Sequence, residues 1–241
     1  MNSKYGEPLF TIPTMVNVAQ MRRVFGFLWG QLPEVDGTPM LEILNVSFIA
    51  DDDHIFGAVN EDYVRRELEW YQSQSLSVND FPGGAPKIWE QVASTKGLIN
   101  SNYGYLLLSD ENGRQYDNVV KKLKEDRFSR QAVAVYTRPT IHDDWNVDGM
   151  SDFICTNTVQ YVIRENMLHV NVSMRSNDAV FGYRNDYAWQ RHVQNELCRE
   201  FGTKPGFMTW NVGSLHVYPR HYYLVEKFQN AGIHDSVVTR D

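Results

Sequence analysis

SDFICTNTVQYVIRENMLHVNVSMRSNDAVFGYRNDYAWQ, residues 151–190, decides the fold of this chain. Residues 158–164 and 167–174 alternate between apolar and polar side chains, which is typical of β-strands with one buried face. Glu165-Asn166 between them suits the two-residue turn of a hairpin. The stretch therefore predicts a β-hairpin with one apolar and one polar face.

Side chains that can do chemistry flank this hairpin. Cys155 lies just before its first strand, and a compact polar run, residues 175–178, follows its second strand. Gly182 and Asp186 then lead into a helix predicted over residues 187–201, where apolar residues recur at every fourth position. A thiol, an arginine and a carboxylate within one supersecondary unit suit chemistry on a nucleotide.

The rest of the chain adds alternating helices and strands without a repeat or a linker. Helical spacing or capping residues predict helices over residues 14–31, 60–75, 87–92 and 222–228, with another that begins near Val119. Strands are predicted over 41–50 (buried), 131–136 and, as a pair, within 207–218, and loops over 97–105 and 138–152. We expect an α+β fold with a mixed sheet, and residues 1–241 as one domain.

The composition excludes several classes of protein. The net charge of -7 argues against a general nucleic-acid binder, because phosphate backbones recruit basic surfaces. The two cysteines, Cys155 and Cys198, give no disulfide framework, so a reducing cytoplasm is the expected location. We find no apolar run near the roughly 20 residues of a membrane span and no signal-peptide core.

Familiar catalytic motifs are missing from the sequence. It has no G-x-G-x-x-G, no Walker loop, no H-E-x-x-H and no G-x-S-x-G. Its seven histidines and two distant cysteines do not have the spacing of zinc ligands, so no metal is expected. Dinucleotide enzymes, ATPases and zinc hydrolases are therefore disfavoured.

Glu67 is a candidate functional acid. In the helix predicted over 60–75 it shares a face with the apolar residues Leu68 and Tyr71. A carboxylate on an apolar face is costly unless it has a partner. The alternative is a structural role, as a solvated edge residue or as the ion-pair partner of Arg66 or another basic group.

Cys155 has three interpretations. A lone cysteine is usually a small core residue. A nearby cation such as Arg175 would instead lower its pKa and raise the thiolate fraction. A cysteine hydrolase with His216 and Asn211 is the third possibility, and it is weaker, because such nucleophiles usually lie at a helix N-terminus and Cys155 precedes a strand.

Two further sites also have a structural alternative. Asp186 is either a functional carboxylate or the N-cap of the helix that follows it. His216 and Tyr218 point to the same side of a predicted strand. They either donate hydrogen bonds to a sugar or are half-buried residues with polar tips.

The motifs together resemble those of the thymidylate synthase family. They are R-E-L-E-W at 66–70, the cysteine before a hairpin, R-S-x-D-x-x-x-G at 175–182 and L-H-V-Y at 215–218. Within the family the chain is most similar to the bacteriophage branch that hydroxymethylates deoxycytidylate (dCMP). Stretches such as INSNYG, CTNTVQY and GYRNDYAWQ carry that similarity from about residue 40 to residue 228.

The resemblance implies a sheet-to-sheet homodimer that uses 5,10-methylenetetrahydrofolate. Cys155 would add to carbon 6 of the pyrimidine and so make carbon 5 a nucleophile toward the one-carbon unit. Loss of tetrahydrofolate would leave an exocyclic methylene group. Thymidylate synthases reduce that group with hydride, whereas the bacteriophage branch adds water.

The resemblance also implies a role for each site residue. Cys155 is the nucleophile, Glu67 organises water and proton transfer, and Tyr103 lies near the site. Phosphate binds to Arg175 and Ser176, with Arg130 from the partner subunit, and the deoxyribose hydroxyl binds to His216 and Tyr218. The substrate-binding set is Arg130, Arg175, Ser176, Asn177, Asp186, His216 and Tyr218, and the folate-binding set is Trp89, Asp178 and Gly182.

Asp186 would select the base. Thymidylate synthases have asparagine here, whose amide can both donate to and accept from uracil. An ionised aspartate only accepts, which suits the amino group of cytosine and a protonated ring nitrogen 3. We therefore expect Asp186→Asn to shift the preference toward dUMP.

The chain departs from the family in four places. One is Ile154-Cys155-Thr156, where thymidylate synthases have Pro-Cys-His and which follows the bacteriophage type. Gln131 replaces one of two tandem phosphate arginines, Val92 replaces a folate-side tryptophan, and the closing C-terminal segment is not recognisable. Alternatives within the family are a dCMP methyltransferase, a CMP hydroxymethylase and a thymidylate synthase. A nucleotide-binding protein without turnover is the alternative from another class.

Overall fold

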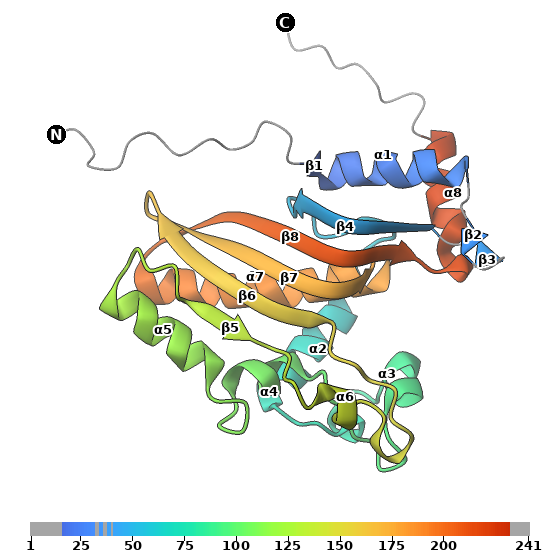
Figure 1. Ribbon diagram of the computed structural model, residues 1–241. Helices are drawn as coiled ribbons and strands as arrows, with labels where there is room; N and C mark the ends of the chain where they lie inside the picture. Colours follow the sequence, from blue (N-terminus) through green and yellow to red (C-terminus); the bar gives the residue numbers. More distant parts are fainter. Residues whose placement is uncertain (1–15, 32–33, 36–37, 40, 232–241) are drawn as a thin grey trace, which may run out of the picture.

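A six-stranded mixed sheet is the centre of the computed structural model (Figure 1), which describes residues 16–31, 34–35, 38–39 and 41–231. Its strands lie in the order β1-β4-β8-β7-β6-β5. Their bounds are β1 Val16–Asn17, β4 Leu41–Ile49, β5 Val133–Val135, β6 Thr156–Arg164, β7 Met167–Asp178 and β8 Lys204–Val217. β1 pairs with β4, and β7 with β8, in parallel, and the other neighbours are antiparallel. The predicted α+β class and mixed sheet are confirmed.

The hairpin of β6 and β7 forms as predicted. Glu165 and Asn166 connect the strands with positive φ of 49° and 59°, the conformation that a tight two-residue hairpin turn requires. The alternate residues Leu168, Val170 and Val172 are buried. β7 is longer than predicted and runs to Asp178, because β8 pairs with it along its full length.

β8 corrects a prediction. Residues 207–218 do not form a strand pair, because residues 204–217 are one continuous strand. The strand stays extended since β4 and β7 hydrogen-bond to its two sides.

α7, Phe181–Phe201, lies along one face of the sheet (Figure 1) and buries Trp189, Val193 and Leu197 there. It begins six residues earlier than predicted. The carboxylate of Asp178 accepts hydrogen bonds from the backbone N–H groups of residues 180 and 181 at 3.0 and 3.2 Å, and so caps the first turn from the end of β7. Asp186 therefore lies inside the helix and is not its N-cap.

The remaining helices surround this core. They are α1 Val18–Trp29, α2 Glu61–Ser73, α3 Lys87–Val92, α4 Tyr103–Leu108, α5 Gln115–Glu125, α6 Ile141–Asp144 and α8 Tyr222–Ala231. Short 3-10 turns (η1 Val78–Asp80, η2 Val147–Gly149, η3 Pro219–His221) and a two-stranded pair (β2 Glu34–Val35, β3 Thr38–Pro39) complete the described elements. The helices predicted over 60–75, 87–92 and 222–228 are confirmed. The helix predicted over 14–31 begins only at Val18, after β1, and residues 14 and 15 lie outside the described residues; α5 begins at Gln115, ahead of the predicted Val119. α4 and α6 lie in segments predicted as loops. α4 forms because Asn102 accepts a hydrogen bond from the N–H of Tyr105 at 2.8 Å.

α2 and α4 touch through their backbones at Gly104. A Cβ atom on Gly104 would lie 1.7 Å from the carbonyl oxygen of Tyr71, at the end of α2. Only glycine allows this approach.

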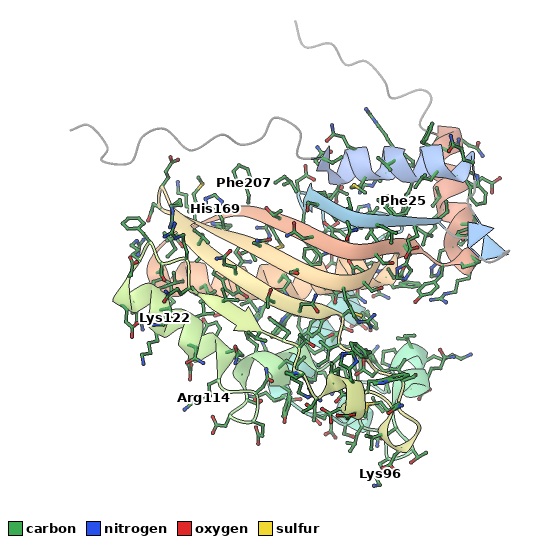
Figure 2. The ribbon with its side chains drawn as sticks, viewed as in Figure 1. Phe25, Lys96, Arg114, Lys122, His169 and Phe207 are labelled. Atoms are coloured by element: carbon green, nitrogen blue, oxygen red, sulfur yellow. The ribbon has the colours of Figure 1, made fainter. Side chains whose placement is uncertain are left out.

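The second face of the sheet carries exposed and half-buried side chains. Leu44 in β4 is 64% exposed, and of the strand predicted as buried only Leu41 and Phe48 are fully buried. Asn211 of β8 donates to Asn171 of β7 and accepts from Ser47 of β4, which makes a polar row across the face. Figure 2 labels Phe207 and His169 near one end of this face, where their rings lie 5.5 Å apart. No helix in the described part of the chain has the length and apolar character of a membrane span.

Candidate active site

Cys155 lies directly before β6 and contacts Arg175 of β7. The Nη2 of Arg175 lies 3.5 Å from the thiol sulfur and donates to the carbonyl of Phe153 at 2.7 Å, and its Nε donates to the carbonyl of Ile154 at 3.0 Å. The guanidinium also lies 4.7 Å from the centre of the Phe153 ring. Arg175 is thus held beside the sulfur by two residues of one loop, Phe153 and Ile154.

The protonation of Cys155 differs from the expectation. Burial raises the pKa of the Cys155 thiol to about 11, and although Arg175 lowers it, Asp186 and Asp152 raise it further. Arg175 acts in the expected direction but does not outweigh burial. The thiol is therefore protonated at neutral pH, and its proton must leave before the sulfur can attack.

Glu67 of α2 is a buried acid with neutral partners. The Tyr63 hydroxyl donates to its carboxylate at 2.7 Å, and the indole N–H of Trp89 lies 3.2 Å from the same oxygen. Burial raises the pKa of Glu67 to about 7, and these two hydrogen bonds oppose that rise. The predicted alternative, an ion pair with Arg66, is wrong, because Arg66 donates instead to the carbonyl of Pro82 at 2.5 Å.

Asp186 projects from the second turn of α7. The Nδ2 of Asn177 donates to its Oδ2 at 2.7 Å, and the Tyr103 hydroxyl also hydrogen-bonds to it. Burial and then the charge of Glu67 raise the pKa of Asp186 to about 8. This raised pKa favours the neutral carboxyl in the unliganded protein near neutral pH, in contrast to the ionised aspartate expected beside cytosine.

Tyr103 connects this carboxyl to the loop of Cys155. Its ring is buried at the start of α4, and its hydroxyl accepts a hydrogen bond from Thr156 at 2.9 Å. Because Thr156 follows the cysteine directly, Cys155, Tyr103 and Asp186 lie in one connected group. The structure thus brings together residues predicted from three separate segments.

The proposed sugar-binding pair lies at the end of β8. The rings of His216 and Tyr218 are 4.8 Å apart, and His216 is opposite Asp178 in the β7–β8 register. The pKa of Tyr218 is raised by burial first and then by Asp178, with a smaller contribution from Cys155. Both side chains therefore border the group around the thiol.

Of the other predicted residues, Trp89 and Gly182 lie beside these acids, whereas Arg130 lies apart from them. Ser176 is half-buried opposite Ser214 in β8. Trp89 is half-buried beside Glu67, and Gly182 lies in the first turn of α7, next to Asn177 and Asp186. Arg130 is exposed ahead of β5, where its carbonyl accepts from Gln160 at 2.8 Å, and in the described part of the chain its side chain joins none of these groups.

Sequence reasoning missed three residues that support the site. Tyr63 lies one helical turn before Glu67, so i, i+4 spacing was a signal for it. Asp152, which accepts from the N–H groups of Asn100 and Ser101 at 2.7 Å each, fixes the segment before Cys155. Trp210 donates to Asn177 at 3.1 Å. No local sequence pattern predicts this contact, because the two residues are 33 positions apart in the chain.

Two features outside this group involve other side chains. Asp52, Asp53 and His54 place three possible metal ligands together on a partly exposed turn, where Arg22 already pairs with Asp52 at 2.7 Å. A small cavity of about 170 Å³ is lined by Leu76, Asn100, Tyr105, Glu111, Asn112 and Arg138. Neither feature includes a predicted site residue.

Comparisons with known proteins show which family this chain belongs to. The thymidylate synthase family model matches residues 58–231. Deoxycytidylate 5-hydroxymethyltransferase of Enterobacteria phage T2 is 53% identical over 203 residues, which cover 81% of this chain and 82% of that protein, and the phage T4 protein of the same name is 52% identical over the same shares. Thymidylate synthase of Bacillus subtilis subsp. natto is 31% identical over 163 residues, 65% of this chain and 57% of that protein.

A solved structure shows the same fold. Thermostable thymidylate synthase A from Bacillus subtilis superimposes with a TM-score of 0.64 at 22% identity, covering 87% of this chain and 83% of that one. The family match covers most of the chain, and the two phage relatives extend it at more than half identity. The chain belongs to the thymidylate synthase family.

Proposed function

We propose that the chain transfers a one-carbon unit from 5,10-methylenetetrahydrofolate to carbon 5 of dCMP and captures water, giving 5-hydroxymethyl-dCMP and tetrahydrofolate. The observation that carries this proposal is a half-buried carboxyl, Asp186, in one hydrogen-bonded group with the Cys155 loop. The phage relatives that are identical to this chain at about half of the aligned positions are named deoxycytidylate 5-hydroxymethyltransferase. Thymidylate synthases use the same folate as co-substrate.

Cys155 supplies the covalent step. Its sulfur bonds to carbon 6 of cytosine, the electron pair moves to carbon 5, and that carbon bonds to the one-carbon unit. After carbon 5 loses its proton and tetrahydrofolate leaves, water adds to the exocyclic methylene group and the sulfur–carbon bond breaks. Arg175, 3.5 Å from the sulfur, favours the thiolate that starts this sequence.

Glu67 has the properties of the acid–base residue. A pKa of about 7 lets the carboxyl take up and release a proton near neutral pH, which is the condition for efficient proton transfer. In this proposal it positions the water that adds at the end of the reaction. Tyr63 and Trp89 fix its orientation.

The nucleotide and the folate would occupy opposite sides of this group. Arg175 and Ser176 bind the phosphate, and His216 with Tyr218 binds the sugar. The half-buried ring of Trp89 and the bare backbone at Gly182 fit the flat ring of a folate, which supplies the one-carbon unit. The carboxylate of Asp178 borders that space and has lone pairs to spare beyond its two backbone donors.

We further propose that the chain forms a homodimer through the second face of the sheet. That face is exposed in β4 and β8, where Leu44 is 64% and Phe207 55% exposed. Arg130, exposed near the edge of the sheet, would then reach the phosphate bound in the partner subunit, as the one of the two tandem arginines that this chain keeps. The free thiol of Cys155 requires reducing surroundings such as a host cytoplasm.

Product mass tests the reaction. Protein is incubated with 5,10-methylenetetrahydrofolate and dCMP, CMP or dUMP in separate reactions, and the nucleotide product and the folate product are both identified. We expect hydroxymethyl-dCMP and tetrahydrofolate. A methylated product with dihydrofolate would make the chain a synthase, faster turnover of CMP would change the substrate, and folded protein without turnover would support a binding protein.

The base preference is tested by Asp186→Asn. An amide can donate to the carbonyl of uracil, so we expect the ratio of kcat/KM for dCMP to that for dUMP to fall by about 100-fold or more. An unchanged ratio would show that Asp186 does not read the base.

A further inference from the structure

Asn177 lies between Asp186 and a residue outside the predicted site, Trp210. Its Oδ1 accepts from the indole Nε1 of Trp210 at 3.1 Å, and its Nδ2 donates to Asp186 Oδ2 at 2.7 Å. Asn177 is 3% exposed and Trp210 is fully buried, so water does not compete for the bond between them, whereas Asp186 is half-buried. The three side chains form a continuous row from the core of the sheet to the base-binding carboxyl.

The chemistry of Trp210 fixes the polarity of this row. An indole N–H can only donate, so the amide oxygen of Asn177 must face it. The amide nitrogen then faces Asp186, and Oδ2 of Asp186 must act as an acceptor. A flipped amide would place an N–H against an N–H and leave the buried indole donor without a partner, which is costly.

Packing holds the amide in place. A Cβ atom on Gly182 would lie 3.0 Å from Nδ2 of Asn177 and 3.8 Å from Oδ2 of Asp186. The side chain of Asn177 therefore fills the space against the first turn of α7. The lack of a side chain at Gly182 is what admits the contact.

We propose that Asn177 and Trp210 set the base preference by holding Oδ2 of Asp186 as an acceptor in both protonation states of that carboxyl. This inference rests on the proposed function, in which Asp186 reads cytosine. A neutral carboxyl with no such partner can place its proton on either oxygen and so pairs equally well with cytosine or uracil. With Oδ2 fixed as acceptor, it matches the amino group of cytosine and opposes the O4 carbonyl of uracil.

The other carboxyl oxygen of Asp186, Oδ1, also distinguishes cytosine from uracil. Any proton on Asp186 is then carried by Oδ1, which can donate to the bare ring nitrogen 3 of cytosine. In uracil that nitrogen carries a hydrogen and would meet a second donor. Asn177 and Trp210 are thus positioning residues that act through Asp186.

Two variants test the proposal by different means. Trp210→Phe keeps the ring but removes the indole donor, which frees the amide of Asn177 to turn. Asn177→Asp has nearly the same shape but offers an acceptor to Oδ2, which draws the shared proton there and reverses the polarity. We expect each to lower the dCMP/dUMP ratio of kcat/KM by about tenfold or more, and Asn177→Asp to have the larger effect.

Trp189→Phe is the matched control. Trp189 is also buried, at 1% exposure, and its indole donates to the Tyr136 hydroxyl at 3.1 Å in the core. We expect this variant to lose thermal stability, as Trp210→Phe does, but to keep the wild-type ratio. A general structural role for Trp210 would lower turnover of both nucleotides together and leave the ratio unchanged.

The outcomes separate this inference from the proposed function. Dissociation constants for dCMP and dUMP are measured by calorimetry alongside turnover, so an inactive variant still gives an answer. If wild-type protein prefers dCMP and folded Trp210→Phe keeps that preference, the inference is wrong and the proposed function stands. If wild-type protein does not distinguish dCMP from dUMP, the proposed function itself is wrong. Should Asn177→Asp not fold, Trp210→Phe alone decides.

Discussion

The two sides of the candidate site hold their charged groups in opposite ways. On the hairpin side Arg175 is exposed, and its guanidinium donates to backbone carbonyls beside Cys155. On the helix side Glu67 is 3% exposed, and both Glu67 and Asp186 accept hydrogen bonds from neutral groups. The cation is fixed in charge and open to solvent, whereas Glu67 is enclosed, Asp186 is half-buried, and the pKa values of the two acids are about 7 and about 8.

This difference indicates a division of work. A permanently charged, exposed arginine suits binding of an anion that arrives from solvent. Acids whose protonation changes near neutral pH suit proton transfer and the reading of a base. Replacements on each side should therefore affect different kinetic quantities.

Cys155→Ser gives the largest expected effect, because it removes the group that both sides serve. A serine hydroxyl has a far higher pKa than a thiol and adds poorly to carbon 6, so we expect kcat to fall by at least about 10³-fold. Binding of dCMP, measured by calorimetry, should stay within about threefold of wild type. Substantial turnover by this variant would remove Cys155 from the mechanism.

Glu67→Gln tests the helix side alone. The amide keeps the shape and can still accept from Tyr63, but it cannot transfer a proton, so we expect kcat to fall by about 10²–10⁴-fold with little change in KM for dCMP. Steady-state kinetics on purified protein would measure both. An effect confined to KM would assign Glu67 to binding and erase the contrast between the two sides.

Arg175→Lys tests the hairpin side. An ammonium keeps the charge but not the planar fork that contacts Phe153, Ile154 and the thiol, so we expect KM for dCMP to rise by about 10- to 100-fold. The kcat should fall less than in Glu67→Gln. Tighter binding of the nucleoside lacking phosphate than of dCMP in wild-type protein would argue against a phosphate site here.

Asp186→Asn gives the smallest expected effect, on stability. Below about pH 4 the carboxyl of Asp186 is protonated in both the folded and the unfolded chain. As the pH rises from there to about 8, the carboxyl ionises only in the unfolded chain. The wild-type protein therefore loses stability over that range. The variant lacks this loss. We expect equal melting temperatures near pH 4 and a variant advantage on the order of 5 °C near pH 9. A constant difference across that range would show that Asp186 is not protonated near neutral pH.

Local patterns predicted the elements whose causes are local. The β6–β7 hairpin followed from period-two alternation and the Glu165-Asn166 turn, and α2 followed from its Asn60 cap. The early start of α7 also has a local cause, the Asp178 carboxylate that accepts from the N–H groups two and three residues on, which the spacing of apolar residues alone does not reveal. The unbroken β8 depends on neighbours from two other parts of the chain.

The site shows the same limit. Family motifs located Cys155, Glu67 and Asp186, and the structure brings them together. Their protonation was not predictable, because it depends on burial, which outweighs Arg175 at the thiol and leaves Asp186 mostly neutral at pH 7. The contact between Asn177 and Trp210 joins β7 and β8, and the local sequence of neither strand predicts it.

The glycine at the crossing of α2 and α4 has a consequence for motion. Glu67 is carried by α2 and Tyr103 by α4, and at Gly104 the two backbones meet with no side chain between them that could change rotamer. The two helices should therefore open as one cooperative unit, and their amide hydrogens should exchange with solvent at similar rates. The acid and the tyrosine would then remain in register throughout a catalytic cycle.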